Sequence, residues 1–227
     1  MPYFHNKDVN LLFIHIPKTG GSSLETYFSK KFNMPLNDST LFNTVKRFKG
    51  VSFQHQTYQS LITYPQIFKI DNSHNNLKIL SVVRCPYHRL ISDLFFFKYI
   101  TANSSQAFVF KVLATKYFNT FGANDNHKKP QYLFLLDKDG KMLEENITIL
   151  RMETLNADMA KLGYTDFNIV ANKNSSNFKR NYMSYLNADS IKLINTVYKQ
   201  DFELFNYPMI QFKDISTKDL LKEKELF

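Results

Sequence analysis

Short apolar runs alternate along this chain with segments whose apolar residues recur at helical spacing. The runs are four to seven residues long and end at polar residues or proline, which is typical of strands buried in a sheet. They lie at residues 10–16, 51–55, 77–83 and 147–150.

The segments between these runs predict helices, with a capping box of Ser22 and Glu25 opening the first one. The predicted helices cover residues 22–31, a stretch after 55 that ends near 64, 86–99, 105–118, 153–162 and 188–198. Strands that alternate with helices predict an α/β fold, namely one domain over residues 1–227 with a mostly parallel central sheet flanked by helices. Sheets of this kind bind ligands beyond the carboxyl ends of their strands.

The composition is that of an ordinary globular chain and excludes disorder and fibrous folds. The 227 residues are 44% hydrophobic and 22% charged, and no apolar run approaches the ~20 residues of a membrane span. The single cysteine, Cys85, cannot form an internal disulfide. A formal charge of +9 favours anionic partners, such as nucleotides, nucleic acid, acidic glycans or anionic lipid, without choosing among them.

The first run is followed by a loop that is suited to an anion. Residues 13–25 read FIHIPKTGGSSLE, which puts Lys18, Gly20 and Gly21 between a strand and a helix start. Glycines let backbone N–H groups approach a phosphate closely, and the helix N-terminus adds partial positive charge. The alternative is an ordinary strand–helix turn. The loop is not a Walker A motif, because Lys18 precedes the glycines, and this disfavours an ATP-dependent kinase.

A second run ends in a similar way, at ILSVVRCPYHRLISDLFFFK. Arg84 follows this strand directly, and Arg89 and Ser92 lie three residues apart in the predicted helix. An arginine fork and a hydroxyl are suitable ligands for a phosphomonoester, whereas the alternative is a solvated helix face. The triplet Phe95–Phe97 is expected to pack in the core.

Taken in order, PKTGGSS and VVRCPYHRLISD resemble the two donor-binding motifs of sulfotransferases that use 3′-phosphoadenosine 5′-phosphosulfate (PAPS). The resemblance is greatest to the carbohydrate sulfotransferases, including the Golgi chondroitin and heparan 2-O types and their bacterial relatives. It extends through QYLFLLDKDGK, ILRMETLNADMAKLG and VYKQDFELFNY, and so covers about residues 10–207, leaving 208–227 as a tail. It implies a P-loop-like nucleotide-binding architecture.

The resemblance also assigns roles to residues of the two loops. It implies that Lys18 contacts the 5′-phosphate and the bridging oxygen, where negative charge develops as the sulfuryl group departs. The remaining donor-binding residues that it implies are Thr19, Gly20, Gly21, Ser22, Ser23, Arg84 and Ser92, with Lys173 in a loop that closes over the nucleotide. Arg89 either contacts the donor or braces its loop.

A base is needed for the acceptor hydroxyl, and His55 is the candidate. Residues 53–61, FQHQTYQSL, resemble the family segment Gly-His-x-Thr, with Gln54 in place of the glycine. The alternative is a hydrogen-bonded histidine at the end of a strand. His15 lies inside the first strand and is expected to be a core histidine. The histidines show no metal-ligand spacing, so no metal is expected.

Together with the resemblance, these observations predict an enzyme that transfers a sulfuryl group from PAPS to a hydroxyl of a carbohydrate or glycolipid. The other product is adenosine 3′,5′-bisphosphate. The alternatives are a small-molecule kinase using Mg-ATP and a catalytically inactive nucleotide- or glycan-binding protein. Nucleic-acid binding rests on charge alone and is not expected. The sequence has no transmembrane segment, which favours a bacterial or viral cytoplasmic protein or a truncated form of a Golgi enzyme. It does not indicate an oligomeric state.

Overall fold

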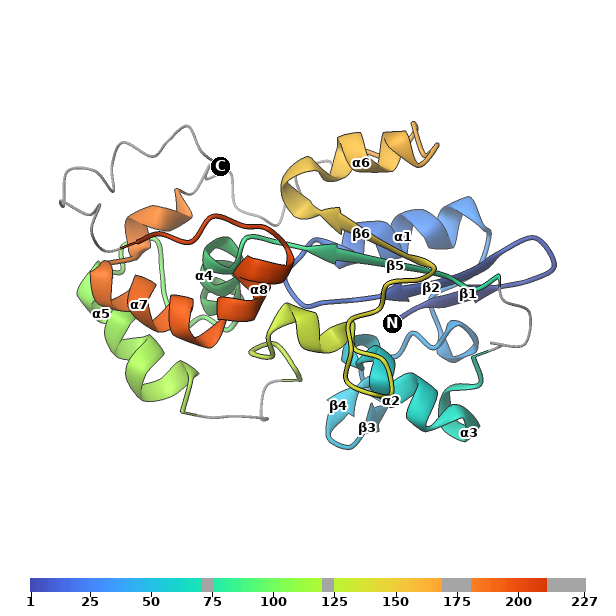
Figure 1. The fold of residues 1–227 in the computed structure, drawn as a ribbon, viewed down its shortest axis with the longest axis horizontal. Helices are drawn as coiled ribbons and strands as arrows, with labels where there is room; N and C mark the ends of the chain where they lie inside the picture. The colour runs from blue at the N-terminus through green and yellow to red at the C-terminus, as the bar shows by residue number, and fades with distance from the viewer. Residues whose placement is uncertain (71–75, 120–124, 169–180, 212–227) are drawn as a thin grey trace. The chain divides into compact units, whose positions relative to one another are not determined.

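The computed structural model describes residues 1–70, 76–119, 125–168 and 181–211 (Figure 1). By its contacts the chain divides into two compact units. The described residues of the first unit are 1–70, 76–83 and 125–168, and those of the second are 84–119 and 181–211. The prediction of one domain over 1–227 stays a prediction, and each unit is described by itself below.

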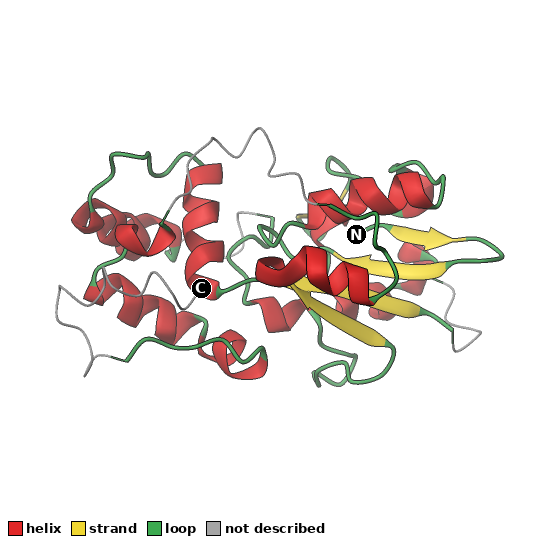
Figure 2. Cartoon of the chain, turned by 90° about the horizontal axis from the view of Figure 1, so that it is seen from above, coloured by secondary structure: helices red, strands yellow, loops and turns green. Residues whose placement is uncertain are grey.

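The first unit contains a four-stranded sheet in the order β1-β2-β5-β6 (Figure 2). Its strands are β1 (Tyr3–His5), β2 (Asn10–Ile14), β5 (Lys78–Val83) and β6 (Ile147–Arg151). β2 pairs in parallel with β5, and β5 with β6, whereas β1 runs antiparallel to β2. The mixed α/β fold with a mostly parallel sheet is therefore confirmed, with β1 as an addition that the sequence analysis did not foresee.

Parallel pairing places the carboxyl ends of β2 and β5 at the same edge of the sheet, with Ile14 opposite Ser81. Alternate residues of these strands, such as Phe13 and Val82, join a core cluster with Phe28 and Met159. Phe28 belongs to helix α1 (Gly21–Lys31) and Met159 to helix α6 (Leu155–Lys161), which follows the 3₁₀ turn η5 (Met152–Thr154). The cluster anchors both helices to one face of the sheet, and α1 thereby begins at the edge where β2 ends.

The sequence predicted a strand over residues 51–55. The prediction is wrong for residues 53–55, because the strand ends at Ser52. β4 (Val51–Ser52) pairs only with β3 (Arg47–Phe48), in a separate small antiparallel sheet, and a 3₁₀ turn η2 (Phe53–His55) follows. The physical reason is that carbonyl oxygens of this turn have other partners: that of Phe53 accepts from the N-terminal amine of Met1 (2.7 Å), and that of His55 accepts from Asn126 Nδ2 (3.0 Å). Those carbonyls then need no neighbouring strand.

Other short elements complete the first unit. They are the 3₁₀ turn η1 (Asp38–Thr40), helices α2 (Tyr58–Thr63) and α3 (Pro65–Phe68), and the 3₁₀ turn η4 (Gln131–Phe134).

The described part of the second unit is helical. Its elements are α4 (Pro86–Phe96), α5 (Gln106–Val112), the π-helical turn η3 (Leu113–Tyr117), the 3₁₀ turn η6 (Tyr182–Tyr185), α7 (Ala188–Val197) and α8 (Lys199–Leu204). The hydroxyl of Tyr117 donates a hydrogen bond of 2.6 Å to Asp93 in the interior of this unit. Of the triplet Phe95–Phe97, which was expected in the core, Phe95 and Phe97 are only half-buried, and the prediction is wrong for Phe96, the last residue of α4, which is 57% exposed.

Candidate active site

The loop between β2 and α1 is a tight turn built by its own residues. The buried Thr19 hydroxyl donates a 2.8 Å hydrogen bond to the carbonyl oxygen of Ile16. Lys18 and Gly20 both have positive φ angles, 67° and 87°. The Thr19 hydroxyl therefore stabilises the turn. The Lys18 side chain is half-buried and belongs to the loop that follows β2.

The capping box predicted for Ser22 and Glu25 is wrong. Helix α1 begins one residue earlier, its N-cap is Gly20, and no side chain in the described structure caps its first turn. Ser22 is exposed and Ser23 half-buried, whereas Glu25 turns into the core. Because the first amides of a helix have no partner within it, this N-terminus of an eleven-residue helix favours an anion.

Glu25 is instead part of a buried pair with His15. Its Oε1 lies 2.6 Å from His15 Nδ1, and Gln54 Nε2 donates to its Oε2 at 3.0 Å. Burial alone would raise the pKa of the Glu25 carboxyl, but His15, the N-terminal amine and Gln54 together outweigh burial and lower it. His15 is thus a buried, hydrogen-bonded histidine, as expected. Gln54, which departs from the family segment, connects its turn to α1 through Glu25.

His55 lies directly beside His15. The two rings meet edge to face with centroids 5.1 Å apart, and the ring of His127 meets His55 in the same way at 5.0 Å. Burial lowers the pKa of His55 to about 4, although the hydrogen bond that His55 donates to Asp125 opposes this shift. His55 is therefore neutral at pH 7 and has a nitrogen that can accept a proton.

Asp125 is a residue of this cluster that the sequence analysis missed. Its Oδ2 lies 2.8 Å from His55 Nδ1 and accepts from the Ser52 hydroxyl at 2.8 Å. Its Oδ1 accepts from the Ser52 amide at 2.6 Å and from Arg47 at 3.2 Å. Although burial raises the pKa of this carboxyl, the hydrogen bonds from His55 and Ser52 hold it well below its usual value. The feature of the sequence that could have indicated Asp125 is the run of polar residues Asp-Asn-His at 125–127.

The second motif lies on α4 and the two residues before it. Cys85 is the N-cap and Pro86 the first helical residue, as the sequence predicted. The Arg84 guanidinium stacks on the ring of Tyr182 at 5.1 Å, and Ser92 is half-buried. Arg89 is 3% exposed and stacks on Tyr198, so it braces the interior of this unit and is not placed as an open ligand.

The predicted site residues therefore fall into two groups. The first unit brings the loop of Lys18, Gly20 and Gly21 together with His55, because His15 touches both. Arg84 and Ser92 belong to the second unit. Lys173 lies outside the described residues.

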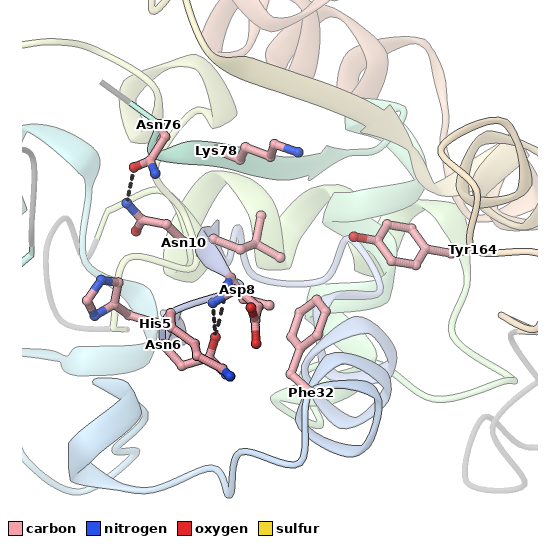
Figure 3. A pocket seen from close by; sticks show the side chains of 11 residues that line it. His5, Asn6, Asp8, Asn10, Phe32, Asn76, Lys78 and Tyr164 are labelled. Carbon is pink, nitrogen blue, oxygen red and sulfur yellow. Dashed lines mark hydrogen bonds between the residues drawn. The ribbon is translucent and has the colours of Figure 1, made fainter. Parts of the chain in front are cut away.

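A separate cavity of about 610 Å³ lies at the opposite end of the sheet (Figure 3). It is lined by Asn10 and Lys78, the first residues of β2 and β5, and by Phe32 and Tyr164. Neither the loop after β2 nor His55 lines it. This cavity is consequently at the amino ends of the strands, away from the edge where parallel sheets bind their ligands.

The described residues lack two features that would indicate other functions. No cluster of three or more His, Cys, Asp and Glu side chains with metal-binding geometry occurs among them. Nor does this part of the chain contain a helix long and apolar enough to cross a bilayer.

Comparison with known proteins gives one result. Residues 1–208 match the model of a family described as the sulfotransferase family. No curated protein and no solved structure matches the chain. The match covers both loops, His55 and Asp125, so the resemblance drawn from the sequence is confirmed at the level of the family.

Proposed function

This chain belongs to the sulfotransferase family, and we propose that it transfers a sulfuryl group from PAPS to a hydroxyl of a carbohydrate or glycolipid acceptor. In this reaction the acceptor oxygen forms a bond to sulfur as the bond from sulfur to the 5′-phosphate oxygen breaks. The acceptor loses its proton, and the other product is adenosine 3′,5′-bisphosphate.

The proposal rests on a series of contacts that connects the loop after β2 with a neutral histidine, His55. Gly21, at the first turn of α1, packs against His15, and His15 packs against His55. A group that binds anions and a group that accepts protons are thus neighbours at the carboxyl edge of one sheet. Sulfuryl transfer requires both, because negative charge grows on the leaving phosphate while the acceptor hydroxyl must lose a proton.

Residues of the loop fit the 5′ end of the donor. The uncapped start of α1, the exposed Ser22 and the half-buried Lys18 together offer amides, a hydroxyl and a full positive charge. In the proposed mechanism Lys18 stabilises the charge that develops on the leaving oxygen. Thr19, Gly20, Gly21 and Ser23 complete the proposed cradle.

His55 is the proposed general base and takes the acceptor proton. Arg84 and Ser92 are proposed ligands of the 3′-phosphate, for which a guanidinium fork is well suited. The stacking of Arg84 on Tyr182 supports this role, because it holds the guanidinium in one plane before any ligand binds. Lys173 keeps its proposed role in closing over the nucleotide.

The direct test is transfer of ³⁵S from labelled PAPS to a panel of glycans and glycolipids, with EDTA present. The expected result is a labelled acceptor and stoichiometric adenosine 3′,5′-bisphosphate, because the proposed chemistry uses no metal. Calorimetric titration separates the alternatives: adenosine 3′,5′-bisphosphate should bind in the micromolar range, about −8 kcal/mol, and Mg-ATP should not. Preferential binding of Mg-ATP would instead indicate a kinase, and donor binding without any labelled product a protein that only binds.

A further inference from the structure

Asp125 approaches His55 from a segment 70 residues further along the chain. On one side of the His55 ring, Nδ1 lies 2.8 Å from Asp125 Oδ2. Asn126 Nδ2 also donates to the His55 carbonyl oxygen at 3.0 Å, and the ring of His127 packs on the His55 ring. Three consecutive residues thus hold both the backbone and the side chain of His55.

The contacts of Asp125 determine which nitrogen of His55 carries the proton. Among the described residues, the other partners of its oxygens are all donors, namely the Ser52 amide, the Ser52 hydroxyl and the Arg47 guanidinium. A carboxylate in these surroundings is ionised and accepts only. The short contact with His55 therefore requires a hydrogen on Nδ1, which leaves the lone pair of the neutral ring on Nε2.

We propose that Asp125 is a positioning residue for the reaction: it holds His55 in the tautomer whose Nε2 accepts the acceptor proton, and it stabilises the imidazolium that results. This inference rests on the proposed function for its chemistry, but the geometry of the pair stands independently of it. The proton passes from the acceptor oxygen to Nε2, while the proton on Nδ1 stays between His55 and Asp125.

The pair of His55 and Asp125 differs from the neighbouring pair of His15 and Glu25 in the groups that pack against the histidine ring. His15 is covered on its other side by Gly21, because a Cβ added to that glycine would lie 2.8 Å from His15 Nε2. His55 meets aromatic edges of His15 and His127 instead. Within the part of the chain that the structure describes, the charged and titratable groups that act on His55 are Asp125, His15 and His127, and Asp125 is the acidic one.

The test compares Asp125→Asn with Arg47→Met. Asparagine has the same shape but can present an NH₂ group to Nδ1, which would move the ring hydrogen to Nε2. We expect kcat to fall at least about 100-fold, with the KM for PAPS and the affinity for adenosine 3′,5′-bisphosphate within about twofold of wild type. Arg47→Met removes a 3.2 Å contact with Asp125 and a 3.0 Å hydrogen bond to the Gly50 carbonyl oxygen, both made by a half-exposed side chain, and kcat should stay within a few-fold of wild type.

A second readout is independent of activity. The side-chain ¹⁵N chemical shifts of His55 in the wild-type protein should report a protonated Nδ1 and an unprotonated Nε2 at pH 7. In Asp125→Asn they should report the opposite tautomer. An unprotonated Nδ1 in the wild type, or a fully active and folded Asp125→Asn, would overturn the role of Asp125.

The failure of this inference can be told apart from failure of the proposed function. If the wild type transfers no sulfuryl group, the proposed function fails, and the ¹⁵N shifts still decide whether Asp125 sets the tautomer. If Asp125→Asn does not fold, the wild-type shifts decide the question, and Asp125→Glu supplies the activity comparison. A longer carboxylate keeps the charge, so it should retain more kcat than a neutral residue at this position.

Discussion

The α-carbon of Gly21 lies against the ring of His15 so closely that a Cβ at Gly21 would come within 2.8 Å of its Nε2 and Cδ2 atoms. The first turn of α1 can therefore take no other residue at this position without moving the histidine. Since His15 also touches His55, the start of the helix and the proposed base share one buried partner. The loop proposed to bind the donor and the proposed base are consequently placed by the same packing.

Replacing either proposed catalytic side chain should abolish turnover and leave the fold intact. We expect Lys18→Met and His55→Gln each to lower kcat by about 10²–10⁴, because one loses charge stabilisation and the other the base. The matched controls are Lys30→Met, at an exposed position of α1, and His5→Gln, at an exposed position of β1. The ³⁵S-transfer assay measures kcat, and circular dichroism checks folding. Wild-type turnover in either Lys18→Met or His55→Gln would contradict the assigned role.

The activity should persist to a lower pH than an ordinary histidine base allows. Burial lowers the pKa of His55 to about 4, so the neutral, proton-accepting form prevails at all pH values above this. As pH falls through about 4, His55 gains a proton and activity is lost. We expect kcat/KM for the acceptor, measured at saturating PAPS, to stay level from pH 7 to about 5 and to be halved near pH 4.

An unperturbed histidine would instead give half of the activity near pH ~6.5. Half-loss at that pH would mean that His55 is not the base or that it becomes exposed when donor binds. Circular dichroism at each pH excludes acid unfolding as the cause.

Arg84 should distinguish ligands by their 3′-phosphate. A guanidinium–phosphate contact contributes about 1.5–3 kcal/mol, so Arg84→Ala should weaken adenosine 3′,5′-bisphosphate about 10- to 100-fold. Adenosine 5′-phosphate, which lacks the 3′-phosphate, should be affected little. Arg84→Lys keeps the charge but loses the fork and the stacking on Tyr182, and it should give an intermediate loss. Calorimetry measures both ligands; equal losses would show that Arg84 does not contact the 3′-phosphate.

Two glycines of the first unit allow a matched test of how tightly the loop between β2 and α1 is packed. Gly20 and Gly163 have nearly the same φ, 87° and 89°, but a Cβ at Gly20 would lie 2.3 Å from Met152 Sδ, whereas the space around Gly163 is open. Both alanine variants carry the backbone cost of about 1–2 kcal/mol. Gly20→Ala should be destabilised by about 0.5–1.5 kcal/mol more, because the end of the flexible, half-buried Met152 side chain must leave its rotamer.

Denaturant unfolding of the two variants under the same conditions gives this difference directly. Equal free energies of unfolding would mean that Met152 yields without cost, and that Gly20 is needed only for its backbone conformation.

By itself the sequence determined the features that depend on neighbouring residues. The apolar runs of β2 and β5 identified the parallel core, and Pro86 after Arg84 identified the start of α4. The same local reasoning located the Lys18 loop, whereas the resemblance of residues 53–61 to a sulfotransferase segment singled out His55. Short runs of branched and aromatic residues and a proline at a helix start carry this information without reference to any distant part of the chain.

Only the tertiary structure decided which side chains are partners. Ser22 and Glu25 have the spacing of a capping box, yet Glu25 turns inward because a buried histidine ten residues earlier is a stronger partner than a solvent-exposed amide. Asp125 contacts His55 although 70 positions separate the two residues in the sequence, and the periodicity of the sequence does not predict such a contact. Burial sets the pKa of His55, and burial is a property of the packed core, so the sequence could name a candidate base but not the pH range in which it would act.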